Sequence, residues 1–423
     1  MIDELFHDAL CKGLWRAMTI LIDNPSIAKD SIFRASVHNY AYDRQCEWSR
    51  HEYMYRMINL SSHKKILIAD IIAEFPRQKD QMDDRDVVQW YALLCLFARD
   101  GNQQARKAMV DMYSVCLDQW YDNLVVSSLL ELDWLDALLF VVRENGKHIH
   151  THPEVWYDDS LILDTQKYIP GLNLWEFLRE QSQTDPLIAA YYESVMVCLA
   201  RQKDYASIRP KQSYAYQSIV SHIQAWKMFH FYRKKYIHPS SLLRLADHVQ
   251  KELDPKKKSQ YLKVFRHYPF PLWYEWLLPF LDHDNDVLRR SACDALLLFT
   301  DPDIKSFLVD LYPSLPTEKI VDVFPLLLAF MMPDDEATIL IIVKSIHDHN
   351  SFHAIGMDIL SFYEKQSFDI APQLLTMIYH QGFCGCCRHT AVKVLQKNHC
   401  LPEEIHDERN YDSYGISHEI DNK

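Results

Sequence analysis

Residues 277–311 read LLPFLDHDNDVLRRSACDALLLFTDPDIKSFLVDL. An apolar run that carries Pro279 ends in a polar turn, and a second apolar run opens at Val287. Apolar residues at helical spacing on both sides of a short polar turn predict two antiparallel helices. Asp286 is the expected N-cap of the second helix, because its carboxylate can accept a hydrogen bond from an orphan N–H of the first turn. This helix–turn–helix unit decides the fold class that the rest of the chain must fit.

The same register returns further along the chain. Second helices are expected to begin near Asp286, Thr317, Ser351 and Cys387. In three of these helices the same three positions recur, as Arg289, Ala292 and Leu296; His353, Gly356 and Leu360; and Arg388, Ala391 and Leu395. Spacings of three and then four keep these residues on one helix face, with the small residue where two helices approach closely.

The unit resembles a HEAT repeat, whose second helix begins with Asp, Val and Arg before an Ala-rich apolar face. The resemblance is clearest over residues 271–400 and is to the short, bacterial type of repeat. It implies an all-α fold, an α–α superhelix or HEAT-like solenoid of antiparallel helix pairs. It also implies that Arg289 and Arg388 stand where such repeats place an arginine that bonds neighbouring turn residues, without a catalytic role.

Glycine usage supports a helical protein. Only eight of the 423 residues are glycine, whereas α/β folds spend glycine on turns and phosphate-binding loops. Neither GxGxxG nor GxxxxGK[ST] is present, so we expect no nucleotide cofactor.

The sequence also bears on the compartment. The first residues lack the basic and apolar regions of a secretory signal. The longest apolar run, residues 323–332, is far shorter than the ~20 residues of a membrane span. Ten cysteines without an export signal indicate a reducing compartment. We therefore expect a cytoplasmic protein with no membrane partner.

Five segments are expected along the chain. Residues 145–184 break the helical rhythm, because they hold Asn145-Gly146, Pro153 and Pro170-Gly171, which favour loops. The predicted organisation is N-terminal helical repeats at 1–144, an irregular insertion at 145–184, a basic helical segment at 185–270, HEAT-like repeats at 271–400, and an acidic C-terminal tail at 401–423 that frays near its end.

Charge is distributed unevenly. Residues 201–268 hold fifteen lysines and arginines against four acids, in a chain whose formal net charge is −13. Basic side chains interleaved with aromatic rings suit a phosphate backbone with stacked bases. Solvated lysines and arginines that pair with acids of neighbouring repeats are the alternative. The candidate binding residues are Lys227, Arg233, Lys234, Lys235, Lys257, Lys258, Arg266, Trp226 and Tyr232.

Two groups of residues could hold a metal. Cys384 and Cys387 form a CxxC pair, and His399 and Cys400 could complete four soft ligands for zinc. A redox-active thiol and plain buried cysteines remain alternatives for this cluster. His148, His150 and His152 alternate along the sequence, so an extended segment would place them on one face, where they could bind a transition metal.

The sequence favours a non-catalytic α-solenoid scaffold that binds a protein partner on a curved helical surface. The alternative is a nucleic-acid-binding protein that uses residues 201–268. One form of it would resemble the HEAT-like DNA glycosylases, although that family's catalytic aspartate and tryptophan cannot be placed here by motif. Trp273, Trp276 and Leu277 lie at helical spacing and are expected in the core.

Overall fold

The computed structural model describes residues 2–43, 45–47, 49–78, 83–118, 122–208, 215–225, 237–332, 335–365, 372–408 and 412–414. Within these ranges the regular structure is entirely helical, so the prediction of an all-α protein is confirmed. The chain forms two compact units. The first contains residues 1–210, 384–386 and 406–423, and the second contains residues 211–383 and 387–405.

The first unit begins with twelve consecutive helices in the described ranges. They are α1 (Ile2–Lys12), α2 (Trp15–Asp23), α3 (Lys29–Val37), α4 (His51–Leu60), α5 (Lys64–Gln78), α6 (Asp84–Arg99), α7 (Gln103–Asp118), α8 (Asp122–Leu130), α9 (Trp134–Thr151), α10 (Ser160–Tyr168), α11 (Leu174–Gln181) and α12 (Pro186–Ile208).

Helix α6 is central to the core of the first unit, where it packs against α3, α4, α7 and α8. Trp90 and Tyr91 of α6 are fully buried, and each donates a hydrogen bond to a backbone carbonyl, that of Ile71 (2.8 Å) and that of Met109 (2.6 Å) respectively. Buried Gln89 donates to the carbonyl of Ala35 at the end of α3 (2.8 Å). These bonds let α6 bury polar atoms without leaving them unsatisfied.

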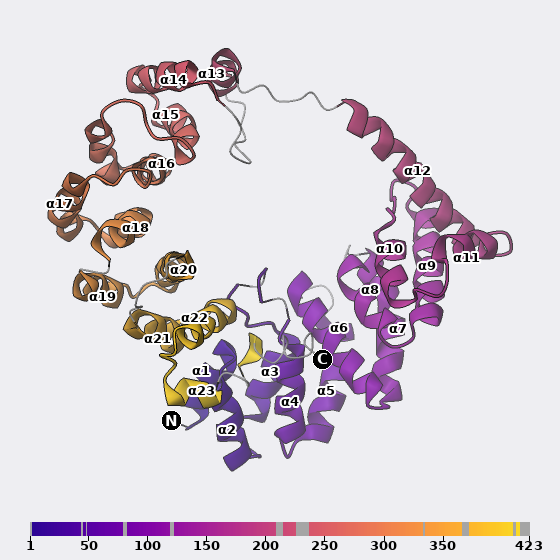
Figure 1. Cartoon of the computed structure of the whole chain (residues 1–423). Helices are drawn as coiled ribbons and strands as arrows, with labels where there is room; N and C mark the ends of the chain where they lie inside the picture. Colours follow the sequence, from indigo (N-terminus) through magenta and orange to yellow (C-terminus); the bar gives the residue numbers. More distant parts are fainter. Residues whose placement is uncertain are drawn as a thin grey trace. The chain divides into compact units, whose positions relative to one another are not determined.

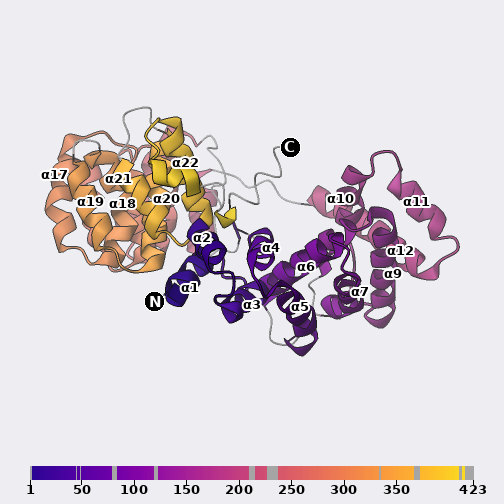
Figure 2. The same ribbon diagram turned by 90° about the horizontal axis from the view of Figure 1, so that it is seen from below.

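Helix α9 continues through Asn145 and Gly146, where the sequence predicted the start of an irregular insertion. Asn145 is buried and accepts a hydrogen bond from the hydroxyl of Tyr113 (3.0 Å). A Cβ at Gly146 would lie 1.9 Å from the carbonyl oxygen of Leu187. The glycine therefore serves close packing rather than a turn, since it lets α12 run directly alongside α9 (Figure 2).

The C-terminal segment 412–414 is docked within the first unit. Gly13 adopts a left-handed conformation (φ 72°) in the turn between α1 and α2, and its carbonyl accepts a hydrogen bond from the N–H of Ser413 (2.8 Å). Asp412 and Ser413 are both buried. Backbone pairing and burial therefore hold these residues of the predicted acidic tail, and the end of the tail, where fraying is predicted, lies outside the described residues.

The second unit contains the stretch from which the fold was predicted. Its helices are α13 (Tyr216–Gln224), α14 (Pro239–Lys251), α15 (Pro255–Leu262), η1 (Lys263–Arg266), η2 (Tyr274–Trp276), η3 (Leu278–Asp282), α16 (Asp286–Leu296), α17 (Pro302–Leu311), η4 (Tyr312–Ser314), α18 (Thr317–Met331), α19 (Glu336–Ser345), α20 (His349–Lys365), α21 (Pro372–Gln381) and α22 (Gly385–Lys397). A short helix, α23 (Glu403–Glu408), follows.

Helices α16, α18 and α20, here called the second-helix row, pack one on the next. They lie along one side of the second unit, and α17 and α19 lie along the other (Figure 1). α16 and α18 begin at the predicted residues, and α20 and α22 begin two residues earlier than predicted. The N-cap of α16 is Asn285 rather than Asp286, since the side-chain oxygen of Asn285 accepts from the N–H of Leu288 (2.9 Å).

The apolar run before the central turn forms two short 3₁₀ helices, η2 and η3, instead of an α-helix. Trp273 consequently does not face the core: its exposed fraction is 80%, while Leu277 is fully buried. The core prediction is therefore wrong for Trp273, because the α-helical spacing on which it rested is absent here. No helix in the described ranges is both long and apolar enough to cross a membrane.

Candidate functional site

Arg289 holds the central turn. Its Nη1 donates to the backbone carbonyls of His283 (2.6 Å) and Asp284 (3.1 Å), and its Nε donates to the carboxylate of Asp322 on α18 (3.0 Å). The side chain is almost fully buried. The arginine therefore satisfies the carbonyls of its own turn and joins α16 to the next helix of the second-helix row.

Arg388 repeats this arrangement in α22. Its Nη1 donates to the carbonyls of Gly382 and Phe383, both at 3.0 Å. In each case the acceptors stand six and five residues before the arginine. The prediction that Arg289 and Arg388 bond neighbouring turn residues is confirmed by these contacts.

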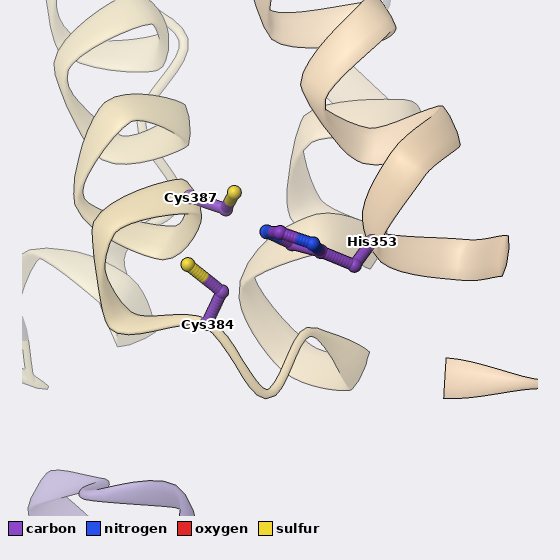
Figure 3. Close-up of side chains that lie close together, drawn as sticks. All are labelled: His353, Cys384 and Cys387. Atoms are coloured by element: carbon purple, nitrogen blue, oxygen red, sulfur yellow. The ribbon is translucent and has the colours of Figure 1, made fainter. Parts of the chain in front are cut away.

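His353 occupies the same register position in α20, but different side chains lie next to it. Its imidazole points from α20 towards Cys384 and Cys387 at the start of α22 (Figure 3). One ligand atom from each of the three residues lies within 4.8 Å of the other two. The position that carries a guanidinium in α16 and α22 thus carries an imidazole beside two sulfur atoms in α20.

The chain around the two cysteines is fixed locally. Phe383, which precedes Cys384, packs its ring on His349 in the first turn of α20, with ring centroids 4.1 Å apart. Cys384 is grouped with the first unit, but only two residues separate it from Cys387 in the first turn of α22. Both cysteines are buried, and His353 is half-buried.

The predicted set of four zinc ligands is only partly assembled. Cys384 and Cys387 come together as expected, but the group of candidate ligands in the described part of the chain contains neither His399 nor Cys400. His399 lies beyond the end of α22 with φ 56°, and the thiol of Cys400 donates to the carbonyl of Leu395 (3.5 Å). The sequence analysis missed His353 as a neighbour of the two cysteines, although the repeat register had singled out its position.

Two thiols and one imidazole form a soft ligand set. Such a set suits Zn²⁺ and disfavours Mg²⁺ and Ca²⁺, which prefer oxygen ligands. Three protein ligands leave one tetrahedral position for a water molecule or another donor.

The alternating histidines do not lie in an extended segment. His148 and His150 belong to the last turn of α9, where Nδ1 of His150 lies 2.8 Å from the carbonyl oxygen of Gly146. His152 follows the helix, and its ring centroid lies 4.6 Å from that of His148. The prediction of one shared face is wrong for His150, because in a helix only residues three or four apart share a face.

Six of the nine predicted binding residues of the basic segment lie outside the described residues. They are Trp226, Lys227, Tyr232, Arg233, Lys234 and Lys235. Of the other three, Lys257 donates to the side chain of Gln224 (3.1 Å), and Arg266 lies 3.7 Å from the carboxylate of Asp294.

Lys258 makes cation–π contacts with two aromatic rings. Its Nζ lies 5.3 Å from the ring centroid of Trp276 and 5.0 Å from that of Phe280. Burial lowers the pKa of this lysine. Arg266 beside Asp294 fits the alternative of pairing with acids of neighbouring repeats, whereas Lys257 contacts an amide and Lys258 lies near aromatic rings.

Two carboxylates occupy equivalent positions in the second-helix row. Asp294 in α16 and Asp358 in α20 each stand five residues after the register position held by Arg289 and His353. Burial raises the pKa of Asp358 to about 6, and the negative charge of Asp294 adds to this rise. Burial also raises the pKa of Asp294, and Arg266 opposes this rise. Asp294 therefore lies close enough to Asp358 for its negative charge to affect that carboxyl group.

Comparison of the chain with protein-family models, curated proteins and solved structures finds no match.

Proposed function

We propose that the protein is a non-catalytic helical-repeat scaffold, an α-solenoid of HEAT-like units, that binds a protein partner along the second-helix row. The observation that carries the proposal is the succession of α16, α18 and α20, each packed on the next. In such an array each helix pair buries its apolar face only against its neighbours, so the row extends one surface across several repeats. The turn contacts of Arg289 and Arg388 support this repetition.

The carboxylates of the row define the chemistry of the partner. Asp358 is half-buried, and no cation in the described part of the chain pairs with it. A carboxylate whose pKa is raised by burial and by a neighbouring acid gains from an incoming positive charge. The formal net charge of −13 would also attract a basic partner from a distance. The proposed partner segment is therefore rich in lysine or arginine.

The compartment belongs to the same proposal. None of the ten cysteines is in a disulfide bond. Ten cysteines without a disulfide support a reducing environment, and we place the scaffold in the cytoplasm.

The test is fluorescence anisotropy of a labelled deca-lysine peptide with the purified full chain at low salt. We expect a dissociation constant on the order of micromolar that weakens with added salt. The double variant Asp294→Asn/Asp358→Asn should weaken binding roughly tenfold, because it removes both carboxylates from the row.

A matched control removes one charge elsewhere. Asp310 is exposed on α17, on the other side of the second unit, and Asp310→Asn should change the affinity by less than about twofold. Absence of peptide binding at low salt, or an equal loss in the control variant, would contradict the proposal.

Labelled single- and double-stranded DNA serve as the second probe. Tight DNA binding with a log–log salt slope steeper than about −3 would indicate several phosphate contacts and would favour the nucleic-acid function of residues 201–268 instead.

A further inference from the structure

We infer that His353, Cys384 and Cys387 form a zinc site that fastens α20 to α22. The three residues come from the two helices that the site would join: His353 projects from α20, and the two cysteines flank the start of α22 (Figure 3). The inference does not depend on the proposed partner, because metal binding can be measured on the isolated chain.

The ligand spacing fits a zinc ion after a small adjustment. The three ligand atoms lie within 4.8 Å of one another. Zinc bonds of about 2.0–2.3 Å in a tetrahedron place ligand atoms roughly 3.3–3.8 Å apart. The required contraction is at most about 1.5 Å, which rotation of the three side chains can supply.

The cysteine spacing favours a metal over an isolated thiol. The CxxC pair places Cys384 just before α22 and Cys387 in its first turn, so that both sulfur atoms face the imidazole (Figure 3). Spacing of this kind is common among zinc ligands. Two thiolates also cancel the charge of Zn²⁺, so the buried site would carry no net charge.

The repeat register supplies an independent argument. At the equivalent position Arg289 crosses from α16 to Asp322 on α18, thirty-three residues further along the chain. His353 reaches from α20 to Cys387, thirty-four residues further along. Both contacts join two second helices, the first through a guanidinium and a carboxylate and the second through an imidazole and thiols. A bound metal would replace the ion pair as the link between consecutive repeats.

The first experiment is metal analysis of the full chain, loaded with zinc under reducing conditions and then desalted. We expect about one zinc per chain, and below about 0.1 in Cys384→Ser and in Cys387→Ser. Titration with Co²⁺ should produce a thiolate-to-cobalt charge-transfer band and the visible spectrum of a tetrahedral ion. The variants should lack both.

His353→Arg is the most informative variant. It places at this position the residue that the equivalent positions of α16 and α22 already hold, so the chain should fold, as checked by circular dichroism. It should nevertheless lose zinc. The double variant His399→Ala/Cys400→Ser alters the two ligands expected from sequence alone, and it should keep about one zinc per chain.

Three results would overturn the inference. The first is a wild-type chain with less than about 0.1 zinc and no cobalt charge-transfer band. The second is a folded His353→Arg variant that retains its zinc, and the third is loss of zinc in His399→Ala/Cys400→Ser with retention in His353→Arg.

Discussion

Helices α16 and α20 share one sequence register but differ in the side chains that occupy it. Residue by residue, α16 has Arg289, Ala292 and Asp294 where α20 has His353, Gly356 and Asp358. In α16 the arginine bonds its own turn and Asp322, and Arg266 lies beside Asp294. In α20 the histidine faces two cysteines instead. Equivalent positions of these two helices therefore carry different side-chain chemistry.

The largest expected effect on the free energy of unfolding is that of substituting Arg289, the first of the three positions in α16. Arg289→Ala leaves the carbonyls of His283 and Asp284 without this donor and removes one cation from Asp322, at a cost of about 3 kcal/mol in the free energy of unfolding. Urea denaturation of both proteins would measure the loss.

Arg290 provides the control for that measurement. It is more than half exposed; it pairs with Asp286 at the surface, and its Nε also lies 3.3 Å from the carboxylate of Asp322. Arg290→Ala thus also removes a cation from Asp322 but keeps the turn contacts, and it should cost less than about 1 kcal/mol. Equal effects of the two substitutions would mean that the turn contacts of Arg289 add nothing measurable to the free energy of unfolding.

The carboxylates should differ in their dependence on pH. Asp358 has a folded pKa of about 6, above its ordinary value of 3.8, so folding takes up a proton between these values. Its contribution is therefore most favourable below pH 3.8, and stability falls as the pH rises through about 6. Asp358→Asn removes this penalty and should stabilise the protein at pH 7.5 by about 2 kcal/mol, a figure discounted for solvent screening.

Thermal unfolding of Asp358→Asn across pH 4 to 8 would test this expectation. The gain over the wild-type chain should grow with pH and vanish near pH 4. A constant gain at all pH values would show that the effect does not come from the titration of Asp358. Asp310→Asn on α17 again removes a charge from an exposed position and serves as the control.

The smallest effect is expected at Gly356, the second of the three positions. A Cβ at Gly356 would lie 3.8 Å from the nearest side-chain atom of Ile378, an ordinary contact, so α20 has room for the alanine that α16 has at Ala292. Gly356→Ala should therefore stabilise the protein by about 1 kcal/mol, because glycine is costly inside a helix. Destabilisation in urea would show that the two helices are packed less alike than their register indicates.

The same substitution at Gly146 should have the opposite effect on stability. A methyl group there would meet the carbonyl oxygen of Leu187 at 1.9 Å. The same exchange should therefore destabilise the first unit, since backbone would have to move.

The sequence predicts well what depends on neighbours along the chain. The Asp254-Pro255 pair is typical of a helix start, and the side chain of Asp254 caps α15 by accepting from the N–H of Lys256 (2.8 Å). The second-helix starts and the turn arginines follow from the same kind of local pattern. Asn285 rather than Asp286 caps α16, an error of one residue between two good capping side chains.

What the sequence could not predict depends on packing between helices. The loop signal of Asn145-Gly146 was outweighed by burial of Asn145 and by the approach of Leu187. His399 and Cys400 are close to Cys387 along the chain, yet His353, more than thirty residues away, is the candidate ligand that lies beside it. Proximity in sequence did not predict this neighbour, because the contact depends on how α20 lies relative to the start of α22.

The hydrogen bond between Gly13 and Ser413 bears on how the chain acquires its structure. Roughly 400 residues separate its two ends, and the entropic cost of closing so long a flexible loop is on the order of 5 kcal/mol. During synthesis the first unit can form most of its core early, but this contact must wait until Ser413 has left the ribosome. Folding of the intervening residues shortens the flexible loop, so an ordered second unit lowers the cost of completing the first.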